Sequence, residues 1–267
     1  MKADMQIAMF DQPNARDRVL KYIKRGNTLC NEAQRKMLRL ENHKELVKAY
    51  IKRYPLCDEV ERALFSIEGM EDILEEYVQK YLLCDDVELK MLEKKNAKEL
   101  VKLYAQKFSL NVDTQIKLVQ SKKMRDILKE YIKIHPLHWA GELAILEQEN
   151  AVEFLREYTQ KHPLQSDAEI KILGLCGFDE FMQEYIEKYP LCDETQIMMF
   201  KIDGNKEFVK SYIRAGYTLC NQAQVKMVES ANSEELIKMY TQLHYLCDEA
   251  MLRQFDLSKS NYGLLAK

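Results

Sequence analysis

The sequence predicts an all-α fold, an α-α superhelix (solenoid) of nine two-helix repeats with a C-terminal capping helix. A tyrosine recurs every 27 or 28 residues along almost the whole chain, and a leucine follows each tyrosine after six or seven residues. A fixed period of this length is typical of stacked repeats. The tyrosines are Tyr22, Tyr50, Tyr77, Tyr104, Tyr131, Tyr158, Tyr185, Tyr212 and Tyr240, and the leucines are Leu29, Leu56, Leu83, Leu110, Leu137, Leu164, Leu191, Leu219 and Leu246.

The period indicates one repeat domain covering residues 1–267, since no linker or low-complexity segment interrupts it. Pairs of short helices are not stable alone and need the repeats before and after them. The C-terminal cap covers 248–267, of which we expect 257–267 to be a loose tail. The repeats start near residues 3, 31, 58, 85, 112, 139, 166, 193 and 221.

The first helix of each repeat is predicted to start with a capping box. Asp58 is followed three residues later by Glu61, and Asp85 by Glu88. In this motif the two side chains bond backbone amides that the first helical turn leaves open. We therefore expect these carboxylates to stabilise helix starts and not to catalyse. The spacing recurs at Ser166 and Glu169, Asp193 and Gln196, and Asn221 and Gln224.

The second helix of each repeat has an apolar face and a defined end. Leu46, Val47, Tyr50 and Ile51 fall on one side of a helix, and Pro55 cannot continue it. Where one residue is inserted, Gly26 and Gly216 are predicted to form left-handed helix caps. Capping boxes are also expected at Asn42 and Glu45, Asn96 and Glu99, Asn150 and Glu153, and Asn232 and Glu235.

Paired helices stacked in series resemble the bihelical α-solenoids, the class that includes HEAT-like and tetratricopeptide-like repeats. The resemblance is one of architecture and covers nearly the whole chain. The 27-residue unit is shorter than in either group, and the chain has a single Trp and no tetratricopeptide signature. The resemblance implies a scaffold that presents a long surface to a partner, usually a protein.

The composition excludes several classes of protein. With 46% hydrophobic and 31% charged residues but only 8 Gly and 5 Pro, the chain is neither disordered nor a turn-rich β protein. Its net charge of -3 argues against a dedicated nucleic-acid binder. The first ten residues lack the apolar core of a secretion signal, and no apolar run approaches the roughly 18 residues that span a membrane. We expect a cytoplasmic monomer without membrane contact.

Six of the seven cysteines share one repeat position, just before the first helix. Stacked helices lie about 9–10 Å apart, which exceeds the roughly 7 Å limit of a disulfide, and zinc needs about four converging ligands. Packing is the favoured explanation, with a redox role and metal binding as alternatives. Cys176 is off register and is expected in the core near a turn. The six are Cys30, Cys57, Cys84, Cys192, Cys220 and Cys247, and Asn111, His138 and Gln165 replace them in the central repeats.

Two sets of residues are candidates for binding. His135, His138, Trp139 and His162 gather near the middle of the sequence, with Trp139 expected at an N-cap, and Trp is favoured at binding hot spots. Sequence drift in exposed turns is the alternative for this set, and metal binding or catalysis is a third. The other set is a basic row at the ends of the second helices, which comprises Arg25, Lys52, Arg53, Lys80, Lys107, Lys133, Lys161, Lys188 and Arg214.

The basic row has three explanations. Cations suit the negative end of a helix dipole, an acidic protein surface could contact them, and a phosphate backbone could follow them. No Ser-His-Asp order, HExxH, P-loop or GxGxxG is present, so we expect no enzyme, no cofactor and no metal. The predicted function is a non-enzymatic protein–protein interaction scaffold whose partner is another protein. The alternative is nucleic-acid binding along the basic row.

Overall fold

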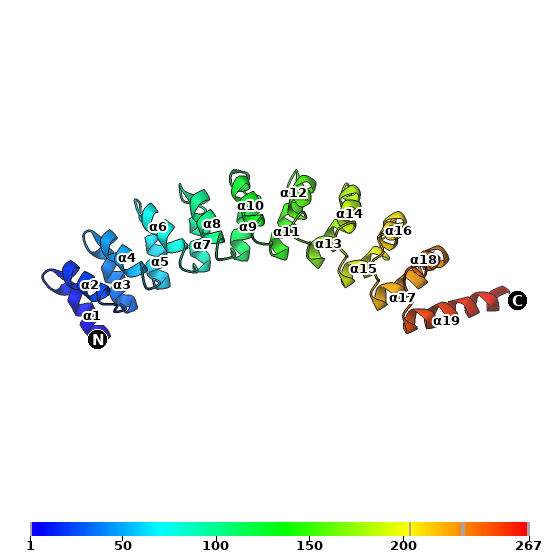
Figure 1. Ribbon diagram of the computed structural model, residues 1–267, viewed down its shortest axis with the longest axis horizontal. Coiled ribbons are helices and arrows are strands. Elements are labelled where there is room, and N and C mark those ends of the chain that lie inside the picture. The colour runs from blue at the N-terminus through cyan, green and yellow to red at the C-terminus, as the bar shows by residue number, and fades with distance from the viewer. Residues whose placement is uncertain (1, 203, 231–232, 266–267) are drawn as a thin grey trace. The chain divides into compact units, whose positions relative to one another are not determined.

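The computed structural model (Figure 1) is helical throughout the part of the chain that it describes, residues 2–202, 204–230 and 233–265, with side chains as far as Ser258. Those residues form 19 α-helices and two short 3-10 helices, and no strand occurs among them. The prediction of an all-α fold is confirmed. The chain divides into two compact units, Met1–Pro136 and Leu137–Lys267.

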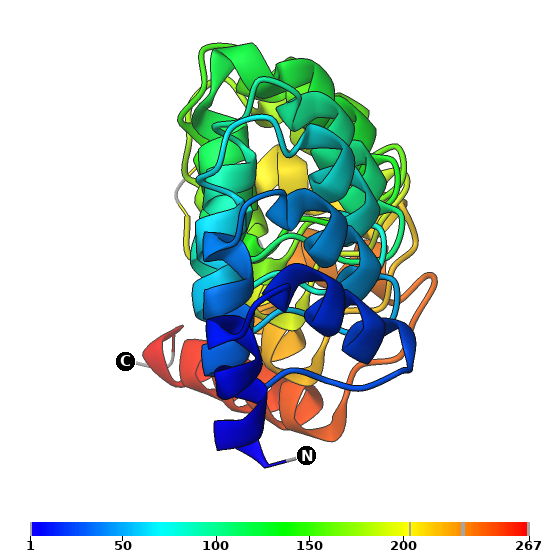
Figure 2. The same cartoon turned by 90° about the vertical axis from the view of Figure 1, so that its left-hand side faces the viewer.

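The first unit contains two layers of helices. Each odd-numbered helix packs against the next odd-numbered one, and the even-numbered helices do the same. Figure 1 shows the even-numbered helices of this unit above the odd-numbered ones, and the turned view in Figure 2 shows both layers. The helices are α1 (Ala3–Ala8), α2 (Ala15–Lys24), α3 (Asn31–Arg39), α4 (His43–Ile51), α5 (Asp58–Leu64), α6 (Glu71–Val78), α7 (Asp85–Met91), α8 (Ala97–Ala105), α9 (Val112–Gln120) and α10 (Arg125–Ile132), with 3-10 helices at Met9–Asp11 and Lys122–Met124.

The second unit continues the alternation and ends in a longer helix. Its odd-numbered helices pack in series from α11 to α19, and α16 packs against both α14 and α18. The helices are α11 (Trp139–Leu146), α12 (Ala151–Tyr158), α13 (Ser166–Leu173), α14 (Asp179–Ile186), α15 (Asp193–Met199), α16 (Lys206–Arg214), α17 (Asn221–Glu229), α18 (Ser233–Tyr240) and α19 (Asp248–Leu265). Because α19 runs to Leu265, the prediction of a loose tail is wrong for residues 257–265.

The recurring apolar residues form the core of each unit. All the tyrosines of the series except Tyr22 are buried, and so are all the leucines except Leu246. The two inserted glycines lie in the left-handed region as predicted, with φ of 82° at Gly26 and 85° at Gly216. A side chain is disfavoured there, which explains glycine at both helix ends.

The predicted capping boxes at the odd-numbered helices are wrong. The N-cap of α5 is Cys57 and not Asp58, which is the first helical residue, and no side chain caps this end. Glu61 is buried and accepts a hydrogen bond from the backbone amide of Cys84, in the next repeat. The same holds at α7, where Glu88 accepts from the amide of Asn111. A local spacing of three residues could not reveal this acceptor, because its donor lies 23 residues away.

The predicted boxes at the even-numbered helices are also incomplete. Asn42, Asn96 and Asn150 do occupy N-cap positions, but none of their side chains makes a capping hydrogen bond. The Asn96 amide instead donates to Glu75 in α6, at 3.2 Å. The box predicted at Asn232 lies outside the described residues.

One side chain at the same place in eight of the odd-numbered helices links its repeat to the next. Its oxygen accepts from the backbone amide that follows the recurring leucine, with N–O distances of 2.6–3.2 Å. Satisfying this amide matters, since an unpaired buried polar group costs about 1–3 kcal/mol. We call these eight residues the linking residues; they are Gln6, Gln34, Glu61 and Glu88 in the first unit and Glu142, Glu169, Gln196 and Gln224 in the second.

The tyrosine hydroxyl adapts to the linking residue beside it. It accepts from the backbone amide of the buried leucine in both cases, as Tyr50 does from Leu29 and Tyr104 from Leu83. Beside Gln34, the hydroxyl of Tyr50 also accepts from the amide nitrogen and donates to a carbonyl. Beside Glu88, the hydroxyl of Tyr104 donates to the carboxylate at 2.7 Å. Glu and Gln are therefore both compatible with the same joint.

Candidate interaction surfaces

His135, in the first unit, has a structural contact. Its Nε2 donates to the backbone carbonyl of Ala105, and its ring stacks on Tyr131 at 5.2 Å. Tyr81 occupies the equivalent position two repeats earlier and donates to the carbonyl of Ile51 at 2.8 Å. A histidine at this position thus keeps the bond that ties one even-numbered helix to the end of the preceding one.

The other three candidates lie in the second unit. His138 is the N-cap of α11, and its Nδ1 accepts from the amide of Ala140 at 3.4 Å. Trp139 is therefore the first helical residue, and the prediction that it takes the N-cap position is wrong. Its side chain is 42% exposed, and its ring lies 5.3 Å from that of His138. His162 packs instead on Tyr158, at a ring distance of 5.3 Å.

Every residue of the basic row is exposed, at or just beyond the end of an even-numbered helix. Some of these cations form ion pairs with nearby acidic side chains. Lys80 pairs with Glu76 at 2.8 Å, and Lys133 pairs with Glu130 at 2.6 Å. Lys188 donates instead to the carbonyl of Thr159 at the end of α12, at 2.9 Å. These contacts fit the stabilisation of helix ends by cations, and the exposure leaves the row open to a partner.

The cysteines lie at the edge of the core. The six at the joint position are only half-buried, whereas Cys176 is exposed, so its predicted place in the core is wrong. Burial, with the nearby Glu61 carboxyl next, raises the pKa of Cys84 to about 12, and burial raises that of Cys192 to about 11. All seven are free thiols. Since the thiolate is the reactive form, these shifts disfavour a nucleophilic role for Cys84 and Cys192.

Asn111, one of the three central residues that replace cysteine, keeps the contact of cysteine with the preceding repeat. Cys220 Sγ lies 3.8 Å from the carbonyl of Asp193. In the first unit, the side-chain amide of Asn111 donates to the equivalent backbone carbonyl, that of Asp85, at 3.1 Å. The cysteine position therefore has a packing role that a small polar side chain can also fill.

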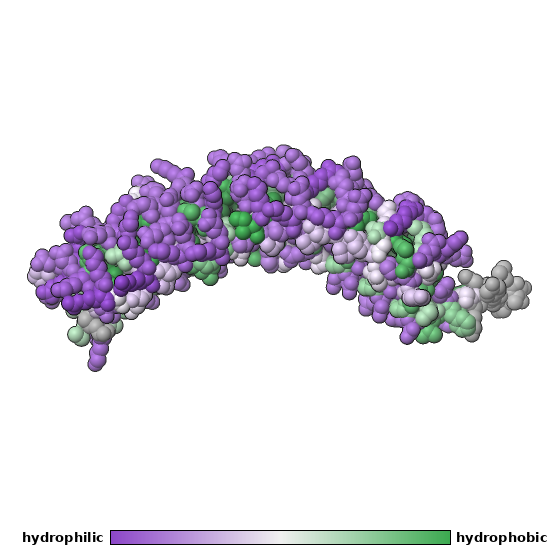
Figure 3. Space-filling model, in the orientation of Figure 1, coloured by the Kyte–Doolittle hydropathy of each residue, from purple (hydrophilic) through white to green (hydrophobic). Residues whose placement is uncertain are grey.

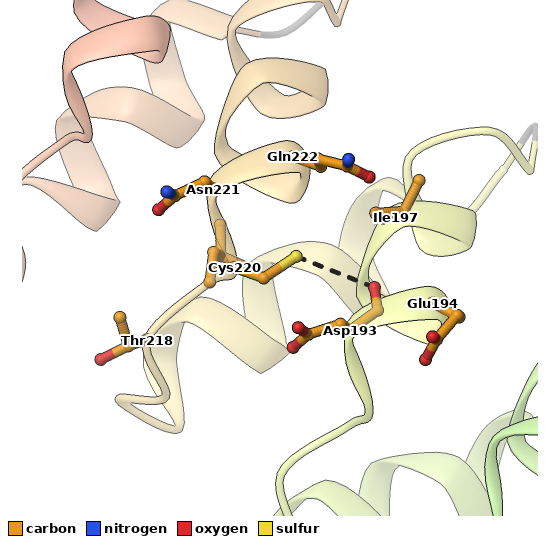
Figure 4. A pocket seen from close by; sticks show the side chains of 8 residues that line it. Asp193, Glu194, Ile197, Thr218, Cys220, Asn221 and Gln222 are labelled. Carbon is orange, nitrogen blue, oxygen red and sulfur yellow. Dashed lines mark hydrogen bonds between the residues drawn. The ribbon is translucent and has the colours of Figure 1, made fainter.

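Cys220 also lines an open polar hollow in the second unit, between the starts of α15 and α17 (Figure 4). The hollow has a volume of about 690 Å³, and Asp193, Glu194, Thr218 and Asn221 contribute most of its polar groups. Among the residues that the structure describes, no three His, Cys, Asp or Glu side chains come together in a way that could hold a metal ion.

An apolar groove lies between α8 and α10 in the first unit. Its floor consists of Val101, Ala105, Ile127 and Tyr131, each at most 6% exposed, and Ile134 forms a wall that is 52% exposed. The cavity has a volume of about 130 Å³. Its rim is charged, because Lys98, Lys102 and Glu130 border it.

Two departures from the repeat pattern line the groove. The residue after each tyrosine is Ile, Val or Thr in every repeat except one, where it is Ala105. The third residue after the tyrosine is Lys or Arg in six repeats, but at Tyr131 it is Ile134. Both changes were visible in the sequence; only the structure shows that they face the same groove, since 29 residues separate them.

The segment that carries the groove is basic. Residues 91–136 contain eleven Lys and Arg against five Asp and Glu, whereas the whole chain has a net charge of -3. Glu130 at the rim is held by Lys133, and this contact, with the nearby Lys102 and Lys98, lowers the pKa of its carboxyl. The groove is thus an apolar site in a locally positive surface.

Exposed large apolar side chains also occur outside the groove, and three of them, Met251, Leu252 and Phe255, lie on α19 in the second unit. The face shown in Figure 3 is mostly hydrophilic, with apolar side chains in small separate patches. Leu82 in the first unit and Leu243 and Tyr245 in the second are examples, at 66%, 59% and 96% exposure. In the described part of the chain, no helix combines the length and apolar character needed to cross a bilayer.

Comparisons with known proteins give no relative to guide the assignment. Neither the family models, nor the curated proteins, nor the solved structures contain a match to this chain.

Proposed function

We propose that the chain is an α-solenoid of nine two-helix repeats and that it acts as a non-enzymatic scaffold for a protein partner. The observation that carries this proposal is the difference between the buried and the exposed positions of each repeat. Buried tyrosines, leucines and linking residues recur and hold the helices together, while some exposed positions, such as those of Trp139 and Ile134, differ from repeat to repeat. Extended surfaces of stacked repeats are commonly used for binding in this way.

Exposed apolar and aromatic side chains support a protein as the partner. Trp139 and Tyr245 are exposed to 42% and 96%, and Ile134 to 52%. Trp and Tyr are enriched among the residues that dominate binding energy at protein interfaces. Polar and charged residues around them suit an interface that forms and dissociates, which is less apolar than an obligate one.

Nucleic-acid binding is the second candidate, supported by the exposure of the whole basic row. The net charge of -3 and the acids that hold Lys80 and Lys133 count against it. A phosphate backbone would bind with a strong dependence on salt, because cations displace the counterions of the nucleic acid.

Affinity capture separates the two candidates. The tagged full chain is incubated with nuclease-treated lysate of its host, and each captured protein is purified and titrated into the chain by calorimetry. Saturable binding to a purified protein supports the scaffold. In parallel, a fluorescent 20-nucleotide RNA and DNA are titrated at 50 and 200 mM salt. Binding that falls steeply with salt and is lost when Lys52, Arg53, Lys80 and Lys107 are changed to Glu, with no protein captured, refutes the scaffold and supports the second candidate.

A further inference from the structure

We propose that the groove between α8 and α10 binds an acidic peptide segment, which inserts one bulky apolar side chain over Ala105 and against Ile134. This inference rests on the proposed scaffold function and specifies where and what it binds. It is carried by three observations that coincide in the first unit: a cavity, an exposed apolar wall and a basic surround.

Ala105 reduces the side-chain volume at the floor of the cavity. In the other repeats a β-branched side chain follows the tyrosine, such as Ile51 in α4 and Val78 in α6, and both are fully buried. Alanine lacks those side-chain atoms, and the neighbouring Val101 and Ile127 do not close the space. A partner's apolar side chain can occupy it and remove apolar surface from water.

The exposed wall is a consequence of Ile134. Lys107 and Lys80 occupy its equivalent positions in the two preceding repeats of the unit. An isoleucine that is 52% exposed, at a place where six other repeats have Lys or Arg, offers apolar contact area at the edge of the cavity. An exposed apolar residue beside a cavity is the arrangement expected of a site that binds one apolar side chain of a partner.

The equivalent groove between α12 and α14, in the second unit, shows what the ordinary residues do. There Thr159 replaces Ala105, and Lys188 occupies the place of Ile134. Lys188 donates to the carbonyl of Thr159 and lies 5.0 Å from the ring centre of Tyr189. This groove is lined by a charged pair, Arg156 and Glu184, and lacks the apolar wall.

Charge selects an acidic segment. Lys98 and Lys102 border the groove, and Lys98 reaches Asp126 only at 3.7 Å, with both side chains more than 60% exposed. Such an exposed pair contributes little, so Lys98 can exchange Asp126 for a carboxylate of the partner. Complementary charge also speeds encounter and orients the segment.

The probe is a phage-displayed library of random twelve-residue peptides, selected on the immobilised full chain. The selected sequence is then synthesised with a fluorescein label, and its dissociation constant is measured by anisotropy. We expect Asp and Glu flanking a Phe, Leu, Ile or Trp. Changing that apolar residue to Ala, or the groove by Ala105→Ile, should weaken binding at least about tenfold, the effect of losing an apolar pocket contact.

Ala105→Ile and the double change of Lys98 and Lys102 each have a control within the same unit. Ala105→Ile and Ile134→Lys both introduce residues that the chain uses at equivalent positions, and Ile134 is exposed, so its variant should fold. Val78→Ile makes a comparable change in α6 and should leave affinity unchanged. The double change of Lys98 and Lys102 to Glu should weaken binding, whereas the same double change at Lys44 and Lys48 in α4 should not. Thermal unfolding by circular dichroism verifies the fold of each.

Two results overturn the proposal: selected peptides without acidic enrichment, or an affinity that neither Ala105→Ile nor Ile134→Lys changes. The proposal is also overturned, in favour of nucleic acid, if a 20-nucleotide RNA displaces the peptide from the groove and Ile134→Lys changes the affinity for that RNA. If a captured protein binds wild type and both groove variants equally, the scaffold function stands and the groove assignment fails. If the groove binds acidic peptides while the chain captures no protein, the groove assignment stands and the scaffold function fails.

Discussion

Replacing the buried carboxyl of Glu142 by Gln should stabilise the chain at alkaline pH. Glu142 has no exposed surface, and it accepts hydrogen bonds from the hydroxyl of Tyr158 at 2.9 Å and from the amide of Gln165 at 2.8 Å. Burial raises its pKa to about 7, from an ordinary value of 4.5, with smaller contributions from the charges of Glu169 and Asp167. The chain itself uses Gln at this position in other repeats, so the substitution fits the joint.

The magnitude follows from linkage between ionisation and folding. Each pKa unit corresponds to about 1.4 kcal/mol. Because the folded-state pKa is the higher one, the folded chain holds this proton longer than the unfolded chain. The stability of the wild type therefore falls as pH rises from about 4.5 to about 7 and then levels off. For the pKa values of 4.5 and about 7, the Gln variant should gain about 1 kcal/mol at pH 5 and about 3 kcal/mol at pH 8.

Urea unfolding at several pH values measures this difference. The single tryptophan, Trp139, belongs to the same helix as Glu142, so its fluorescence reports local unfolding, while circular dichroism reports the whole chain. Glu147→Gln, which removes the same charge from an exposed position at the end of α11, is the control and should change stability by less than about 0.5 kcal/mol. A stability difference between wild type and Glu142→Gln that is the same at pH 5 and pH 8 would refute the reasoning.

Two further predictions concern Tyr104 and Cys84 in the first unit. Tyr104→Phe removes a hydroxyl that donates to Glu88 at 2.7 Å and accepts from the amide of Leu83 at 3.3 Å. Denaturant unfolding should show that the free energy of unfolding falls by about 2–3 kcal/mol, whereas Tyr245→Phe, at a residue that is 96% exposed, should not change it. Because burial raises the pKa of Cys84 to about 12, iodoacetamide at pH 8 should label exposed Cys176 well before Cys84 in the folded chain; mass spectrometry giving the opposite order contradicts this prediction.

Much of the fold was predictable from the chain because the repeats are local. The helix starts follow from a short periodic pattern, as at Asp58 and Asp85, which begin α5 and α7. The buried tyrosines and leucines follow from the same period. Local periodicity is sufficient here, because each repeat packs mainly against its sequence neighbours.

The partners of polar side chains were less predictable. Glu61 and Asp58 have the spacing of a capping box, but Glu61 bonds the amide of Cys84 in the next repeat. Both arrangements satisfy a backbone amide, and sequence spacing alone favours the nearer one. The exposure of Cys176 was missed for a similar reason, because its position outside the repeat pattern gave no register from which to place it.

The sequence by itself determined the period, the helices and the buried residues, because these depend on contacts within a repeat and its neighbours. Only the tertiary structure decided which irregularities meet. Ala105 and Ile134 each depart from the pattern in a different repeat, and stacking of α8 on α10 brings them to one groove. A one-dimensional pattern records each departure separately, whereas a binding surface depends on which side chains the packing of helices places side by side.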